Sequence, residues 1–213
     1  MTGRNLRLIP ALDCKELEDA VRVAGAVGHL DFVYGFKVGF SLGLAHGLPR
    51  VVSQLREHTD KPIIYDHQKA ATDIPATGKL FAETVAAAGV DEAILFPQAG
   101  PETLAAWIDA LGAAGVEIIV GGVMTHPAYL VSEGGFIADE AVTRMYRIAI
   151  ENRVSRFVVP LTKPAVTRQL YQEAGMTDEH RFYSPGLGRQ GGDPEQFEFL
   201  KTHYLIVGRA LLS

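Results

Sequence analysis

Residues 63–75 read Ile63-Ile64-Tyr65-Asp66-His67-Gln68-Lys69-Ala70-Ala71-Thr72-Asp73-Ile74-Pro75. The apolar run from Pro62 to Tyr65 predicts a short buried strand. Two carboxylates and an ammonium follow within eight residues, at Asp66, Lys69 and Asp73. Charges at the end of a buried strand are costly unless they pair with each other or act on a ligand. The stretch is therefore either a structural ion-pair network or a catalytic site.

Composition narrows the class of protein. The 213 residues fit a single domain, residues 1–213, that can bury a full core. The net charge of −5 argues against a nucleic-acid partner, and the lone Cys14 excludes a disulfide framework and a cysteine-based zinc site. There is no apolar run as long as the ~18 residues of a membrane span, and no signal-peptide pattern at the N-terminus. We therefore expect a cytoplasmic protein without a membrane partner.

Apolar runs alternate with amphipathic segments along the whole chain. The predicted strands are residues 6–12, 32–40, 62–66, 92–96, 116–120, 156–160, 181–184 and 204–207. The predicted helices are residues 16–27, 48–57, 79–88, 102–113, 138–152 and 164–173. Such alternation indicates parallel βαβ units. Eight units closing on themselves make a TIM (β/α)8 barrel, with a doubly wound sheet as the alternative. Only six residues follow Val207, so we expect a reduced eighth helix.

Polar side chains stand where the predicted strands end. Asp13 follows the first strand, Lys37 lies in the second, Asp66 ends the third, and Thr125 and His126 follow the fifth. The chemistry of a TIM barrel gathers at the carboxyl-terminal ends of its strands. These residues predict one pocket with both acidic and basic groups.

A glycine-rich turn follows the seventh predicted strand and reads Ser184-Pro185-Gly186-Leu187-Gly188-Arg189-Gln190-Gly191-Gly192-Asp193. A tight surface turn would explain the glycines, but glycine also lets backbone N–H groups approach an anion. The eighth strand ends in Gly208-Arg209, which adds a guanidinium. A phosphate commonly sits after strands seven and eight of a TIM barrel, and this position favours phosphate binding.

Five segments, in order, make the chain resemble the orotidine 5′-monophosphate decarboxylase family of (β/α)8 barrels over nearly its whole length. They are Ala11-Leu12-Asp13, Lys37-Val38-Gly39, Asp66 through Pro75, Met124-Thr125-His126-Pro127, and Pro185 through Asp193 with Val207-Gly208-Arg209. The Lys-Val-Gly strand and the Gln-Gly-Gly-Asp turn are specific only in combination.

The resemblance implies a lyase of pyrimidine (UMP) biosynthesis, a homodimer that decarboxylates orotidine 5′-monophosphate without metal or cofactor. Lys69 would protonate C6 of the pyrimidine within a charge network of Lys37, Asp66 and Asp73. Asp66 would press on the substrate carboxylate, and Asp73 would come from the partner subunit. The implied substrate-binding residues are Asp13 at the ribose, Ile74, Thr77 and Pro185 in the pocket, Thr125 at the pyrimidine, Gln190 between base and phosphate, and Gly191, Gly208 and Arg209 at the phosphate.

The chain departs from the family's Asp-x-Lys-x-x-Asp pattern, because each gap is one residue longer. Strict alternation along a strand would point Lys69 away from Asp66. We expect a bulge or tight turn over His67 and Gln68 to restore convergence. The charged ends of Asp66, Lys37 and Lys69 should then each lie within ~4 Å of an opposite charge. An orientation of His67 and Gln68 toward the pocket stays open.

Two other functions stay open. A magnesium-dependent sugar-phosphate aldolase or decarboxylase of the same wider group would carry a glutamate ligand where Lys37 stands, and an ammonium repels Mg²⁺. A non-catalytic nucleotide-binding barrel is the other, since a fold does not fix a function. Four histidines are not spaced as metal ligands, and three aromatic residues fall at the spacing of core positions. We expect most of four histidines at the surface or in loops (His46, His126, His180 and His203) and three aromatic residues in the core (Tyr129, Tyr146 and Phe157).

Overall fold

The chain folds into a closed barrel of eight parallel strands in sequence order, in a computed structural model that describes residues 3–67, 70–188 and 190–208. Pairing of β1 with β8 closes the barrel, which confirms the TIM barrel over a doubly wound sheet. The strands are β1 (Asn5–Leu12), β2 (Phe36–Gly39), β3 (Ile63–Asp66), β4 (Glu92–Leu95), β5 (Glu117–Gly121), β6 (Arg156–Val158), β7 (Arg181–Ser184) and β8 (Thr202–Val207).

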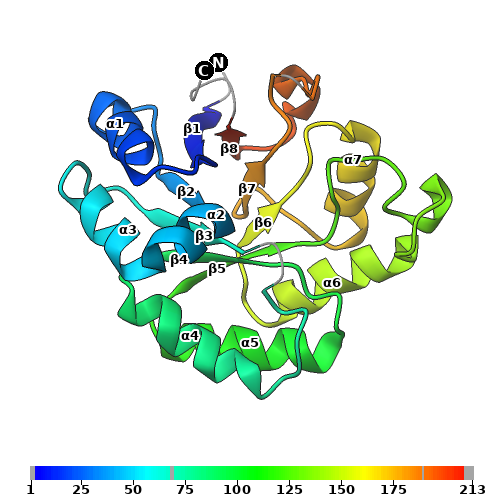
Figure 1. Ribbon diagram of the computed structural model, residues 1–213. Coiled ribbons are helices and arrows are strands. Elements are labelled where there is room, and N and C mark those ends of the chain that lie inside the picture. Colours follow the sequence, from blue (N-terminus) through cyan, green and yellow to red (C-terminus); the bar gives the residue numbers. More distant parts are fainter. Residues whose placement is uncertain (1–2, 68–69, 189, 209–213) are drawn as a thin grey trace.

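The main helices form a ring around the strands (Figure 1). They are α1 (Leu17–Val27), α3 (Leu48–Arg56), α4 (Thr77–Ala87), α5 (Pro101–Ala113), α6 (Asp139–Glu151) and α7 (Pro164–Glu173). Four short pieces complete the set: α2 (Phe40–Leu42), the π-helix η1 (Gly43–Gly47), and the 3₁₀ helices η2 (Val131–Glu133) and η3 (Pro194–Phe197). The stub expected for an eighth helix falls on residues 209–213, outside the described residues. In the part of the chain that is described, the helices are too short or too polar to cross a membrane.

Alternation along the strands divides the core into a barrel interior and an outer layer. Side chains that point inward form one buried cluster: Ile9, Ala11, Ile64, Ile94, Phe96, Ile119, Val158, Tyr183, Tyr204 and Ile206. Their neighbours in sequence, such as Ile63 and Tyr65, pack instead against the apolar faces of the helices. This two-residue period fixes which polar side chains at the strand ends can reach the barrel axis.

A polar cluster closes the amino-terminal end of the barrel. The Glu92 carboxylate, 2% exposed, accepts hydrogen bonds from the hydroxyls of Tyr34 and of Tyr183, the latter at 3.0 Å. Arg156 Nε lies 3.7 Å from the same carboxylate. Burial raises the pKa of Glu92, and its hydrogen bonds and the arginine act in the opposite direction. A carboxylate at this depth requires such partners.

Candidate active site

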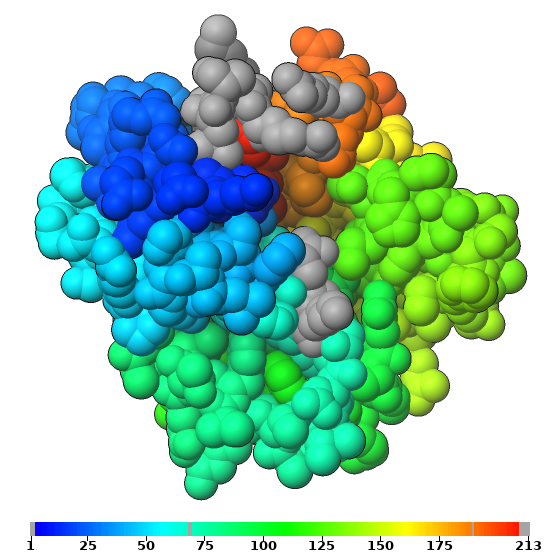
Figure 2. Space-filling model, in the orientation of Figure 1, coloured from blue at the N-terminus to red at the C-terminus, as the bar shows by residue number. Residues whose placement is uncertain are grey.

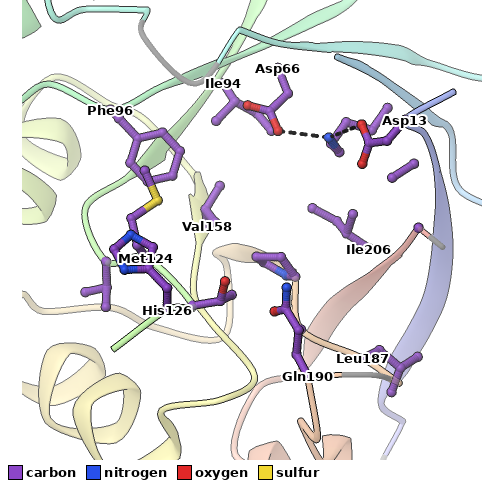
Figure 3. A pocket seen from close by; sticks show the side chains of 17 residues that line it. Asp13, Asp66, Ile94, Phe96, Met124, His126, Val158, Leu187, Gln190 and Ile206 are labelled. Carbon is purple, nitrogen blue, oxygen red and sulfur yellow. Dashed lines mark hydrogen bonds and ion pairs between the residues drawn. The ribbon is translucent and has the colours of Figure 1, made fainter. Parts of the chain in front are cut away.

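A cavity of about 300 Å³ opens at the carboxyl-terminal ends of the strands. The face of the molecule drawn in Figure 2 is hollowed near its centre, beside the blue N-terminal segment. Figure 3 shows the 17 lining side chains. They are Ala11, Asp13, Lys37, Asp66, Ile94, Phe96, Val123, Met124, Thr125, His126, Val158, Pro185, Gly186, Leu187, Gln190, Ile206 and Gly208. The expected gathering of strand ends into one acidic and basic pocket is confirmed.

Lys37 lies between two aspartates on one wall of this cavity. Lys37 pairs in register with Ala11 and Ile64, both inward-facing, and Asp13 and Asp66 each follow two residues beyond those positions. All three side chains therefore point into the barrel. Lys37 Nζ lies 3.2 Å from Asp13 Oδ1 and 3.0 Å from Asp66 Oδ2 (Figure 3). The expected opposite-charge contacts of Lys37 and Asp66 are confirmed.

The two aspartates keep the buried lysine charged. The side chains of Lys37 and Asp66 are only 9% and 5% exposed, whereas that of Asp13 is 49% exposed. Burial alone would lower the pKa of Lys37, but the charges of Asp66 and Asp13 outweigh it and raise the pKa above its ordinary value. The site therefore holds a fixed ammonium with one buried and one solvent-facing carboxylate.

The lengthened motif is described at Asp66 and His67 and again from Ala70 onward. Gln68 and Lys69 lie outside the described residues, so the expected contact of Lys69 and a bulge at Gln68 stay predictions. Beyond them the Ala70 carbonyl accepts a hydrogen bond from Phe96 N at 2.9 Å, and Ala71 has a left-handed backbone with φ +65°. His67 does not belong to the described lining of the cavity. Its Nδ1 lies 2.6 Å from the hydroxyl of Tyr65, a side chain that packs on the helix side of β3. Strand alternation explains this, since His67 falls two residues after the outward-facing Tyr65.

Asp73, Ile74 and Thr77 lie at the surface, apart from the Lys37 cluster. None of them belongs to the described lining of the cavity. Asp73 Oδ1 accepts from Ile74 N at 2.7 Å, and Thr77 Oγ1 donates to the Ile74 carbonyl at 2.7 Å. Ile74 itself is 60% exposed. Within one chain, these three residues do not reach the cavity that Lys37 and Asp66 line.

The glycine-rich turn after β7 forms the opposite wall. Pro185, Gln190 and Gly208 line the cavity, as does Thr125 after β5. Gly191, with φ +76°, follows Gln190 but is not part of the described lining. Arg209 lies outside the described residues. Glycine is required at Gly192, where a Cβ would stand 2.4 Å from the Leu161 Cβ.

A buried histidine forms a hydrogen bond with the residue at which this turn begins, Ser184. His203 is fully buried, so the expectation of a surface or loop histidine is wrong for it. Arg4 Nη2 donates to its Nδ1 at 3.0 Å, and its Nε2 therefore donates to Ser184 Oγ at 2.7 Å. Burial, reinforced by the charge of Arg4, lowers the pKa of His203 to about 3. The ring is a neutral link between β8 and the end of β7.

His126 lies in the pocket that its position after the fifth predicted strand had indicated. It lines the cavity beside Met124 (Figure 3) and lies in a loop, as expected of most of the histidines. Its Nδ1 donates to the Pro127 carbonyl at 2.9 Å. The position of His126 after the end of β5 is what indicated a pocket residue. Tyr129, Tyr146 and Phe157 are buried as expected.

Metal ligands do not gather here. Among the residues that the structure describes, there is no group of three or more His, Cys, Asp and Glu side chains that could hold a metal ion. Asp13 and Asp66 instead share the Lys37 ammonium.

A closed parallel barrel with an Asp-Lys-Asp cluster and a glycine-rich wall at its carboxyl-terminal mouth defines the class of (β/α)8-barrel enzymes with a polar ligand site. The family model described as orotidine 5′-phosphate decarboxylase / HUMPS family matches residues 6–213. The chain belongs to this family.

Individual relatives are similar over nearly their whole length. The orotidine 5′-phosphate decarboxylase of Methanosarcina mazei is 32% identical over 208 residues, which cover 98% of this chain and 88% of that protein. The enzyme of the same name from Methanosarcina barkeri is 34% identical and covers 96% and 86%. The crystal structure of orotidine 5′-monophosphate decarboxylase from Methanocaldococcus jannaschii complexed with inhibitor BMP superposes with a TM-score of 0.82 at 27% identity, covering 98% of this chain and 91% of that one.

Proposed function

We propose that this chain is a cytoplasmic decarboxylase of pyrimidine nucleotide synthesis that converts orotidine 5′-monophosphate into uridine 5′-monophosphate and CO₂, without metal or cofactor. The observation that carries the proposal is the Asp13–Lys37–Asp66 cluster, placed on the cavity wall of a barrel that belongs to this family. A buried carboxylate held beside an ammonium is costly to build, and such clusters in a cleft are typical of catalytic sites.

The chemistry needs a cation where the carboxylate leaves. Breaking the bond between C6 and the carboxylate leaves the electron pair on C6, with no adjacent group to delocalise it. An ammonium at this position stabilises the developing charge and then donates its proton to C6, after which solvent restores the proton. We assign this role to Lys69, the third residue after Asp66. Asp66 would press on the substrate carboxylate, and Lys37 would hold Asp66 in place.

The opposite wall suits the rest of the substrate. Gln190 and Leu187 face the cavity from the turn after β7, across from Asp13 and Asp66 (Figure 3). We assign Gln190 to the contact between base and phosphate, and Gly191, Gly208 and Arg209 to the phosphate. Thr125 would read the pyrimidine and Asp13 the ribose hydroxyls, with Pro185 beside them. Binding energy at the phosphate can be used in the transition state at C6.

We propose further that the active form is a homodimer in which Asp73, Ile74 and Thr77 complete the partner's cavity. Their surface position and the 60% exposure of Ile74 support this assignment. A two-fold dimer would present the same patch from each subunit to the other. Light scattering at micromolar concentration should give twice the mass of the chain. A fully active monomer would contradict the proposal.

Turnover of orotidine 5′-monophosphate in excess EDTA tests the function directly. We expect uridine 5′-monophosphate to appear at the same rate with and without EDTA. The Lys69→Ala variant should lose turnover and still bind uridine 5′-monophosphate. Lys79→Ala, at a lysine whose side chain is 82% exposed on α4, is the matched control and should keep full activity.

Two results would move the assignment elsewhere. Activity on a sugar phosphate that disappears with EDTA and returns with Mg²⁺ would indicate the metal-dependent branch of the family. Nucleotide binding by the unmodified protein without any turnover would indicate a binding protein.

A further inference from the structure

The segment that joins β3 to α4 is anchored at its far end by hydrogen bonds to neighbouring elements. Phe96 N donates to the Ala70 carbonyl at 2.9 Å. Thr103 Oγ1 donates to the Asp73 carbonyl at 2.9 Å, and Trp107 Nε1 donates to the Ile74 carbonyl at 3.2 Å. The backbone from Ala70 onward is therefore fixed against β4 and α5.

Among the described contacts, a side-chain hydrogen bond anchors the near end of the same segment. The Tyr65 hydroxyl and His67 Nδ1 are 2.6 Å apart, a short distance for a hydrogen bond between neutral groups. Burial, and secondarily the charge of Asp66, raises the pKa of Tyr65. The hydroxyl therefore keeps its proton and remains a hydrogen-bonding partner for the imidazole.

This anchor lies behind the strand and not in the cavity. The Tyr65 ring is 7% exposed and stacks on Phe81 of α4, with ring centroids 6.4 Å apart. Gly43 of η1 is also close, since a Cβ built there would stand 3.5 Å from the Tyr65 hydroxyl. With its ring buried against Phe81 of α4, Tyr65 offers His67 a fixed partner.

We propose that the Tyr65–His67 hydrogen bond is a positioning contact for the reaction, which fixes where the chain departs from the strand so that Lys69 meets the substrate. The inference rests on the proposed function of Lys69. The gap between Asp66 and Lys69 is one residue longer than in the family pattern, and strict alternation would turn Lys69 away from Asp66. The anchored His67 and the anchored Ala70 bound the stretch in which this added residue has to be accommodated. In this proposal His67 does not contact the substrate. It acts by fixing the backbone that leads to Lys69.

Two single variants and their combination test the contact. Tyr65→Phe keeps the ring that packs on Phe81 and removes only the hydroxyl. Tyr65→Phe and His67→Ala should each lower kcat about tenfold or more, because displacing a reacting group by about 1 Å costs up to about 100-fold. The KM for orotidine 5′-monophosphate and the Kd for uridine 5′-monophosphate should stay nearly unchanged. The double variant should be no slower than the slower single variant, since both remove one interaction.

A conservative variant and a matched control separate positioning from folding. In His67→Asn the amide oxygen takes the place of Nδ1, and kcat should return close to that of the unmodified protein. Tyr171 of α7 is the matched control. Its hydroxyl donates to Asp178 Oδ1 at 3.3 Å, and Tyr171→Phe, which removes this hydroxyl, should leave kcat unchanged. Unchanged kcat in Tyr65→Phe, or multiplied effects in the double variant, would overturn the inference.

Hydrogen exchange of backbone amides gives a readout that needs no turnover. Residues 66–76 should exchange faster in Tyr65→Phe than in the unmodified protein, and Tyr171→Phe should not change them. Equal exchange rates in Tyr65→Phe would refute the anchor itself. An unmodified protein that is inactive on orotidine 5′-monophosphate would refute the proposed function instead, so the two failures are distinguishable.

Discussion

Replacing Lys37 by methionine removes the charge that Asp66 and Asp13 share while keeping a long apolar side chain. At 3.0 Å from Asp66, and with the effective dielectric constant of ~20 that suits protein sites, the direct attraction is about 5.5 kcal/mol. Much of this energy is offset by the desolvation of both groups. Removing one partner of a buried pair, however, leaves the other charge unpaired and costs about 3–5 kcal/mol. We expect about 3 kcal/mol, near the lower limit of that range, because the cavity admits water to Asp66.

Denaturation in urea, followed by circular dichroism, measures this loss. For a domain of this length, a loss of about 3 kcal/mol also lowers Tm by roughly 6–12 °C. Lys79→Met is the matched control. Its ammonium lies 3.8 Å from Glu83 on the surface, and its replacement should cost less than about 0.5 kcal/mol.

A second substitution identifies the cause of the loss. Adding Asp66→Asn to Lys37→Met removes the buried carboxylate that has lost the Lys37 ammonium and should restore part of the lost stability, even though another polar contact has been removed. A loss below about 1 kcal/mol for Lys37→Met, or a further loss in the double variant, would refute the reasoning that the ion pair holds a buried charge.

Three further predictions follow from other parts of the chain. The folded-state pKa of His203 lies near 3, below the unfolded value of ~6.5, so its contribution to stability is present above pH ~6.5 and is lost as the pH falls toward 3, by up to about 1.4 kcal/mol per pH unit. Urea denaturation between pH 7 and 4.5, within that window, should show this slope, and His203→Asn should lack it; equal slopes would contradict the assignment. Arg153 follows α6 with φ +64°, so Arg153→Gly should stabilise the protein by about 0.5–1 kcal/mol, whereas Arg144→Gly inside α6 should destabilise it by about 1 kcal/mol; thermal denaturation of both variants checks the signs. Arg209→Ala should lower kcat/KM for orotidine 5′-monophosphate by about 100-fold and leave the slow reaction of orotidine, which lacks the phosphate, unchanged; steady-state kinetics with both substrates would refute the role if the two fell together.

The barrel and much of the cavity were predictable from the sequence alone. Parallel strands buried on both faces appear as short apolar runs, and helices between them keep a helical spacing of apolar residues. Their positions in or at the end of predicted strands then placed Lys37 and Asp66 at the end of the barrel where ligands bind. Local rules were sufficient because each of these residues belongs to a regular strand.

Two kinds of residue could not be placed this way: those that follow a strand end in an irregular segment, and those whose partners lie far away in the sequence. The orientation of His67 depends on where the lengthened segment stops following β3, and the left-handed backbone of Ala71 has no signature in an alanine. His203 is buried because Arg4, 199 residues away, and Ser184 supply its partners. Glu92 depends in the same way on Tyr34 and Tyr183. No local pattern reports contacts of that separation.

Closure of the barrel has a consequence for how the molecule folds. The ladder between β1 and β8 runs from the Asn5–Thr202 pair to the Pro10–Val207 pair, so it joins opposite ends of the sequence. Contacts of such large separation are slow to form, because the entropy of the intervening chain is lost before the pairing returns any stability. On the ribosome, neighbouring strands can pair in order, but the edge of β1 stays open until residues 202–207 have emerged. The barrel that still lacks β8 is therefore the species most exposed to aggregation. Pairing of β1 with β8 determines when the newly made chain is protected from it.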